Sequence, residues 1–133
     1  MTDIRRKIQF RPEKGQSLTE FALALPILVL LLFAVIQFGI VFNNYVTLTD
    51  ATRAGARKGA VSRQATDPTG TTVSAVRSSA ADLNQANLSV AVSSTWLAGS
   101  DVRVSASYPY SINLFGVAVK TGVLTSTTTE RVE

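Results

Sequence analysis

The sequence predicts an α+β protein. A long N-terminal transmembrane helix continues into an extracytoplasmic domain with a short second helix and a small antiparallel sheet of about three strands. Three observations carry this prediction. An uncharged apolar run of 22 residues extends from Phe21 to Phe42. Apolar residues then recur at helical spacing, and three later segments alternate apolar and polar residues as strands do.

The apolar run has Gln37 as its single polar side chain. As a helix it is about 33 Å long, enough to cross a bilayer core of roughly 30 Å. Five basic and two acidic residues precede it within residues 1–15, so the positive-inside rule places the N-terminus in the cytoplasm. We therefore expect a basic cytoplasmic leader that is cleaved (1–15), a transmembrane helix (16–42) and an extracytoplasmic domain (43–133).

Composition excludes several classes of function. The 133 residues include no cysteine and no histidine, which excludes thiol catalysis and removes the commonest general base and metal ligand. The net charge of +4 comes mostly from the leader, so the folded part offers no basic patch for nucleic acid. Because no phosphate-binding loop is present either, we expect a non-enzymatic protein without metal, cofactor or nucleic acid.

Glu20 lies at the edge of the apolar run, where a carboxylate usually has a partner. The nearest base, Lys14, can reach toward it by snorkelling. Alternatively, cleavage of the Gly15–Gln16 bond creates an α-amine four residues away. That amine pairs with Glu20 in the same helix or, in an assembly, in a neighbouring helix, where the pair fixes the axial register.

Beyond the apolar run, the helix is expected to continue to about Val61. Ala51, Gly55 and Gly59 recur every four residues and form a small-residue stripe, which lets another backbone approach closely. The stripe accommodates either the domain's own sheet or a neighbouring subunit.

Arg53 and Arg57 lie one turn apart on this helix, with Lys58 beside them. These residues form either a solvated helix face, as charge runs usually do, or a docking face for partner subunits or lipid headgroups.

A loop is expected at Arg63–Thr72, where Asp67, Pro68 and Gly70 interrupt the helical pattern. Residues 72–86 then predict a short amphipathic helix, because apolar residues follow three- and four-residue spacing. Its apolar face consists of Val73, Val76, Ala80 and Leu83.

Three strands are expected at residues 88–94, 102–108 and 123–132, with a turn at residues 98–101. The connection Pro109–Gly122 is apolar for a loop, so we expect it to pack in the core, to touch the membrane or to form a partner-binding edge. Trp96 is expected in the core as well. The apolar side chains of the connection are Tyr110, Ile112, Leu114, Phe115 and Val117.

The segment from Gly15 to Phe21 has a known pattern. A basic leader, a glycine, four variable residues, a glutamate and an aromatic residue precede the apolar helix. This pattern resembles the class III signal of type IV prepilins. With "TLTDATRAGARKGAV", "VRVSASYPYSINLFG" and "LTSTTTERVE", the chain resembles the TadE-like minor pilins, or pseudopilins, of the tight-adherence (Tad) type IV pilus system.

The resemblance implies cleavage after Gly15 by a prepilin peptidase, Gln16 as the new first residue, and an assembly role for Glu20 and Phe21. It implies a non-catalytic subunit in the cytoplasmic (inner) membrane, or in a cell-surface pilus, that acts in biogenesis or priming of an adhesive pilus. The implied partners are the membrane, the peptidase, other pilin-like subunits and Tad inner-membrane assembly proteins. An uncleaved, single-pass scaffold or sensor is the alternative.

Overall fold

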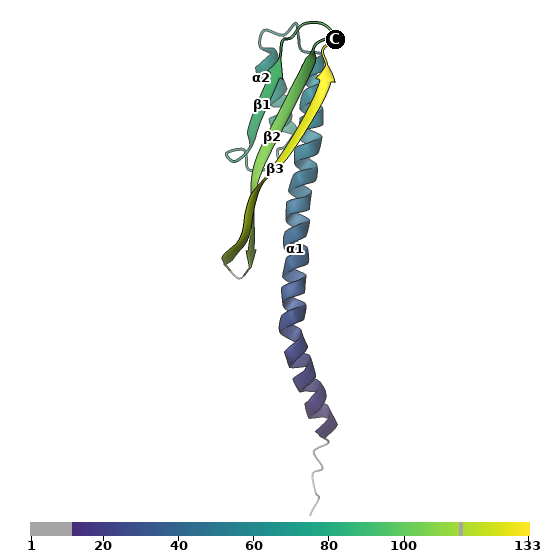
Figure 1. The fold of residues 1–133 in the computed structure, drawn as a ribbon, viewed down its shortest axis with the longest axis vertical. Coiled ribbons are helices and arrows are strands. Elements are labelled where there is room, and N and C mark those ends of the chain that lie inside the picture. Colours follow the sequence, from purple (N-terminus) through teal and green to yellow (C-terminus); the bar gives the residue numbers. More distant parts are fainter. Residues whose placement is uncertain (1–11, 115) are drawn as a thin grey trace, which may run out of the picture. The chain divides into compact units, whose positions relative to one another are not determined.

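The computed structural model describes residues 12–114 and 116–133, so most of the predicted leader lies outside the described residues. The helical segment up to Ile36 is one structural unit, and Gln37–Glu133 is a second. The architecture confirms the predicted α+β class (Figure 1). The elements are α1 (Pro12–Ala60), α2 (Pro68–Ser79), β1 (Ser89–Ser94), β2 (Asp101–Leu114) and β3 (Val117–Arg131).

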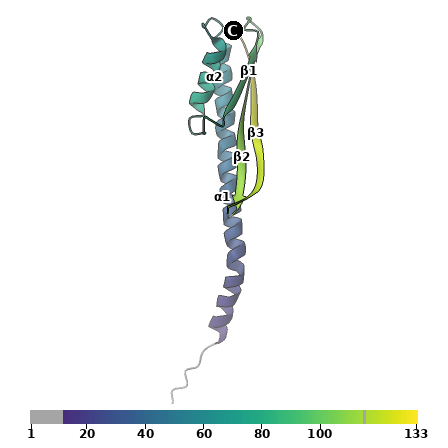
Figure 2. The same ribbon diagram turned by 90° about the vertical axis from the view of Figure 1, so that its left-hand side faces the viewer.

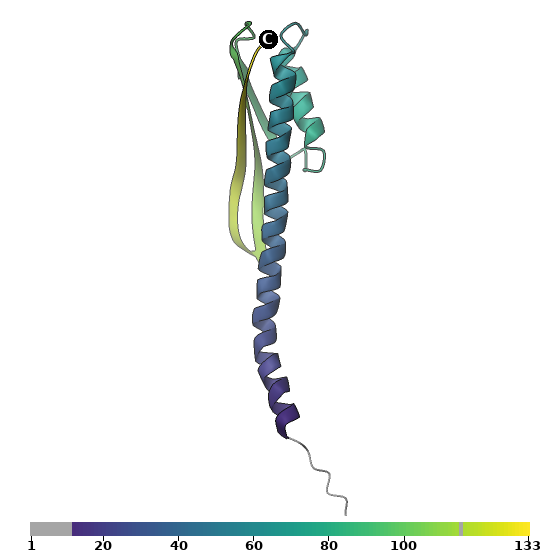
Figure 3. The same ribbon diagram turned by 90° about the vertical axis from the view of Figure 1, so that its right-hand side faces the viewer.

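The three strands form one antiparallel sheet in the order β1-β2-β3. In the register of the sheet, Val104 of the central strand β2 lies opposite Val92 of β1 and Thr128 of β3. The C-terminal part of α1 and the whole of α2 lie on the same face of this sheet (Figures 2 and 3). One face of the sheet is therefore covered by helices, as in other α+β domains.

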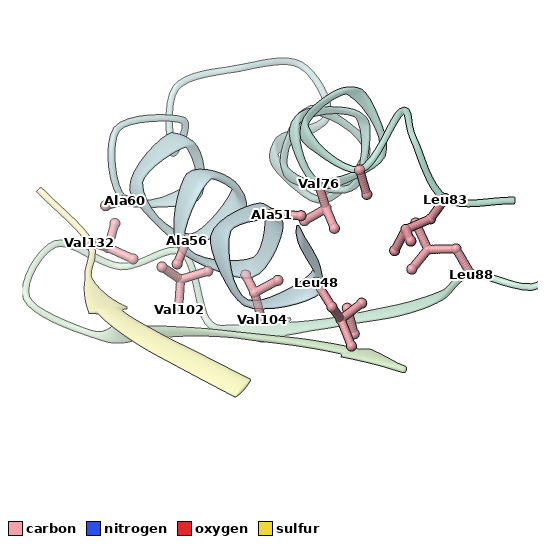
Figure 4. Packing of buried hydrophobic residues seen from close by; sticks show 12 residues of the cluster. Leu48, Ala51, Ala56, Ala60, Val76, Leu83, Leu88, Val102, Val104 and Val132 are labelled. Carbon is pink, nitrogen blue, oxygen red and sulfur yellow. The ribbon is translucent and has the colours of Figure 1, made fainter. Parts of the chain in front are cut away.

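The core lies between α1, α2 and the sheet (Figure 4). α1 contributes mainly alanines, and this small side-chain volume lets the valines of β2 approach the helix backbone. Leu83 and Leu88 fill the space beyond the end of α2. The buried apolar residues are Leu48, Ala51, Ala56, Ala60, Val76, Ala80, Leu83, Leu88, Val102, Val104, Ala106 and Val132.

The second helix begins earlier than the apolar spacing predicts, at Pro68, so the last part of the expected loop is helical. Asp67 is its N-cap, and the Gly70 backbone N–H donates to Asp67 Oδ1 at 2.8 Å. Proline is favoured in the first turn because its missing N–H would have no partner there. The helix ends at Ser79, so Leu83 is buried from the following turn instead of from the helix.

The stretch Pro109–Gly122 is not the predicted connection. β2 and β3 continue through it as a hairpin, with Pro109 opposite Val123 and Leu114 opposite Val117. Gly116 has a φ of +85°, which allows the turn. The expectation of core packing is wrong here, because Val117 is 67% exposed. Hydrogen bonds between two strands can extend a hairpin past the region that the helices cover.

Trp96 lies in the segment between β1 and β2. It is half-buried and packs against the edge of the core, so the prediction of a core tryptophan holds only in part.

Candidate processing site and membrane segment

The N-terminal part of α1 is apolar and exposed. One helix within the described residues is long and apolar enough to cross a membrane, and none of its most apolar 18-residue window is buried inside the protein. Its large side chains, such as Phe21 and Ile27, are 60% and 68% exposed. A continuous apolar surface of this kind fits a lipid environment, so α1 fits a single-pass membrane protein.

Gly15 lies in the first turn of α1, in the open. A β-carbon built at this position meets no atom within 4 Å. Glycine is less favourable than alanine in a helix by about 0.8–1.0 kcal/mol. Packing against the residues that the structure describes therefore gives no reason for glycine here.

Glu20 is exposed and lies one helical turn after Gln16. The Gln16 side-chain amide donates a hydrogen bond to Glu20 Oε1 at 3.1 Å. The Thr19 hydroxyl donates to the Gly15 carbonyl oxygen at 2.9 Å, on the same stretch of helix. The residues predicted for processing and register are thus neighbours on one short helical segment. For Lys14, the other partner considered for Glu20, the structure describes the backbone but not the side chain.

The small-residue stripe faces other elements of the same chain. A β-carbon at Gly55 would overlap Val76 Cγ2 of α2 and lie 3.5 Å from the Thr72 carbonyl oxygen. At Gly59, a β-carbon would lie 2.9 Å from Thr72 Oγ1 and 3.1 Å from Val102 Cγ2 of β2. Both positions are buried, so the two glycines allow α2 and the sheet to approach α1 closely.

The basic residues of α1 point away from this packing. Arg53, Arg57 and Lys58 are all exposed. Arg53 Nη1 lies 3.6 Å from Asp50 Oδ1, in an ion pair whose side chains are 60% and 67% exposed. An exposed pair of this kind contributes at most about 1 kcal/mol to stability.

A buried hydroxyl cluster joins α1 to β3, and the sequence patterns did not reveal it. The Thr52 hydroxyl donates to the Thr49 carbonyl oxygen at 2.8 Å and lies 3.0 Å from Ser126 Oγ. The Thr128 hydroxyl donates to Thr52 Oγ1 at 3.3 Å. Thr52, next to Ala51 of the small-residue stripe, was the one sequence signal for this cluster. Its partner Ser126 is too distant in sequence for a local pattern to identify.

Comparison with known proteins assigns the N-terminal part of the chain. Residues 15–57 match the TadE-like protein family. The match covers about a third of the 133 residues and begins at Gly15. It agrees with the resemblance to TadE-like proteins of the Tad pilus system that the sequence motifs gave.

The TadE-like segment contains the processing and register residues and also Arg53, Gly55 and Arg57, whereas Gly59 lies just outside it. Neither the curated proteins nor the solved structures gave a match. The segments 102–116 and 124–133, which also entered the resemblance, are not covered by the family match.

Proposed function

We propose that this chain is a pilin-like subunit, cleaved after Gly15 by a prepilin peptidase, that acts in biogenesis or priming of a Tad-type adhesive pilus. The observation that carries the proposal is the open environment of Gly15 at the start of the TadE-like segment. A glycine that weakens a helix and packs against none of the described residues is explained by an outside molecule that requires it, and a peptidase is such a molecule.

The Gly15–Gln16 bond lies inside the first turns of α1, which begins at Pro12. A peptidase must draw this bond out of the helix before it can cut. Glycine lowers the cost of that local unwinding, since it is the weakest helix former after proline. The bond is also close to the helix end, where fewer hydrogen bonds hold the backbone.

Cleavage changes the electrostatic surroundings of Glu20. The new α-amine of Gln16 would lie one turn from the carboxylate, where the Gln16 side chain already contacts it. The carboxylate would also lie near the positive end of a newly formed helix N-terminus. In an assembly, a neighbouring subunit's amine offers the same partner out of water, and such a pair favours one axial register over others.

In this proposal the protein sits in the cytoplasmic membrane with its N-terminus in the cytoplasm and residues 43–133 outside. Its partners are the peptidase, other pilin-like subunits and Tad inner-membrane assembly proteins. The exposed apolar segment of α1 supports membrane retention before assembly. The same surface suits packing among the helices of a filament, because it carries one carboxylate at its N-terminal edge and no other charge until Asp50.

Intact-mass measurement tests the cleavage. Co-expression with a prepilin peptidase is expected to remove residues 1–15 and to leave Gln16 first. Gly15→Leu should block the cut without disturbing the fold, since the added side chain enters open space. Gly39→Leu is the matched control, because a β-carbon there also meets no atom within 4 Å, and it should be cut normally. A mass that still starts at Met1 favours the uncleaved anchor.

Substitution of Glu20 tests the register role separately. Glu20→Gln keeps the shape of the side chain and its ability to accept from Gln16, but it removes the charge. We expect this variant to insert and to be cleaved, and to co-purify with the major pilin at a clearly lower level. Full assembly of Glu20→Gln would show that the charge has no part in register.

A further inference from the structure

The far end of the β2–β3 hairpin is an exposed apolar surface that neither packing in the core nor processing explains. We call residues 109–114 and 116–123 the distal hairpin. Val117 and Val119 are 67% and 64% exposed, and Ile112 and Leu114 are half-buried. The hairpin runs beside α1 toward the helix N-terminus within the unit Gln37–Glu133 (Figure 3).

Two contacts give the distance along α1 that each residue of β2 covers. Gly59 of α1 lies against Val102 of β2. Thr52 of α1 lies against Ser126 of β3, and Ser126 is paired with Ala106 of β2. Four residues of β2 therefore cover the same length as seven residues of α1. Those seven helix residues rise about 10.5 Å, so each strand residue advances about 2.6 Å along the helix, less than the full strand rise of about 3.3 Å.

The same advance carries the hairpin past the outer end of the apolar run. Leu114 is eight residues beyond Ala106, which at this advance corresponds to about 21 Å further toward the N-terminus of α1. Phe42, the last residue of the apolar run, is ten residues before Thr52 and lies about 15 Å in the same direction. At this advance, the turn of the hairpin is expected about 6 Å beyond the level of Phe42.

The chemistry of the distal hairpin suits a lipid surface. Lys120 is the single charged residue between Arg103 and Glu130, so this part of the chain has no acid to repel lipid phosphates. A lysine beside apolar residues places its stem among them and its ammonium at the headgroups. Tyr108 and Tyr110 follow further from the turn, and tyrosine is enriched at membrane–water interfaces.

The backbone limits how deep the hairpin can enter. β1 pairs with β2 only from Val102 to Ser107, so the distal part of β2 has an open edge. β3 is itself an edge strand of the sheet. Open edges need hydrogen-bonding partners and are excluded from the hydrocarbon core, whereas the headgroup region supplies such partners. The turn can therefore enter the boundary between headgroups and acyl chains, but not the bilayer centre.

We propose that the distal hairpin inserts its turn into the headgroup–acyl boundary of the bilayer that α1 spans. The hairpin then anchors the domain at a second point, which restrains its tilt relative to the membrane surface. This inference rests on the membrane-spanning state of α1 in the proposed function, and not on cleavage or pilus assembly.

Fluorescence quenching by lipids tests the insertion. Trp96 is the single tryptophan, so Trp96→Phe supplies a silent background in the full chain. Tryptophan is then placed by Val117→Trp near the turn or by Val123→Trp as a matched control. Val123 is 63% exposed, close to Val117, but it lies several residues further from the turn. The probe is a vesicle of phosphatidylcholine and phosphatidylglycerol with brominated acyl chains.

Quenching at position 117 is expected to be at least about twofold stronger than at position 123, because apolar surface at the boundary lies roughly 5–10 Å deep. Equal quenching overturns the proposal. Protection of the tryptophan at 117 from acrylamide without quenching by brominated lipid also overturns it, and indicates that a second protein copy covers the hairpin.

A third variant separates this inference from the proposed function. Leu31→Trp places the probe in the middle of the apolar run, at a position that is 62% exposed. Strong quenching there with equal quenching at 117 and 123 rejects the hairpin alone. Absence of quenching at 31 rejects the spanning helix and, with it, both proposals.

Discussion

Replacing Gly55 by alanine tests whether the small-residue stripe serves packing inside the chain. An alanine β-carbon would overlap Val76 Cγ2, and Val76 is completely buried. Because the Thr72 carbonyl oxygen lies 3.5 Å from the same point, α2 has little room to slide. The substitution therefore forces α2 away from α1 or drives the Val76 side chain out of its rotamer.

Two opposing effects set the magnitude. Alanine gains about 0.8–1.0 kcal/mol over glycine in a helix interior, whereas overpacking a core costs about 1–3 kcal/mol. Gly55→Ala is thus expected to lower the free energy of unfolding by about 1 kcal/mol. Val76→Ala alone leaves a cavity and should cost about 2–3 kcal/mol. In the double variant the new β-carbon enters that cavity, so the loss should be smaller than the sum by about 1–3 kcal/mol.

Thermal unfolding of the full chain in detergent measures these differences. Trp96 reports on the transition, since it is the single tryptophan and packs against the core. For a unit of this size, 1 kcal/mol shifts the midpoint by about 4–8 °C. Gly39→Ala is the control and should not lower the midpoint, because nothing lies within 4 Å of its β-carbon. Simple additivity of Gly55→Ala and Val76→Ala would refute internal packing of the stripe.

The same unfolding assay checks three further substitutions. Thr52→Val removes a buried hydroxyl that Ser126 contacts, so we expect the free energy of unfolding to fall by about 1–3 kcal/mol. A fall below about 0.5 kcal/mol would count against a stabilising role of the hydroxyl cluster. Asp67→Ala removes the N-cap of α2 that accepts from Gly70, and it should cost about 0.5–2 kcal/mol, whereas Asp67→Asn should retain most of the stability. Arg53→Ala breaks an exposed ion pair and should change stability by less than about 1 kcal/mol, so a large loss would reveal a contact beyond that pair.

Local patterns were sufficient for the elements whose signals are short in range. The apolar run and the helical spacing after it predicted one long helix, and the structure ends α1 at Ala60, one residue before the expected position. Alternation of apolar and polar residues located all three strands. The start of α2 was signalled by Asp67 and Pro68, but the pair was interpreted as a loop because both residues also favour turns.

The sequence by itself determined the fold class, the apolar helix and the pattern of Gly15 and Glu20, because each follows from the chemistry of neighbouring residues. Three features are visible only in the tertiary structure. They are the packing of the small-residue stripe against α2 and the sheet, the contact between Thr52 and Ser126, and the length over which β2 and β3 pair. These features depend on contacts between residues far apart in the chain. No local periodicity encodes such contacts, since the partner of each residue is chosen by the packing of the whole domain.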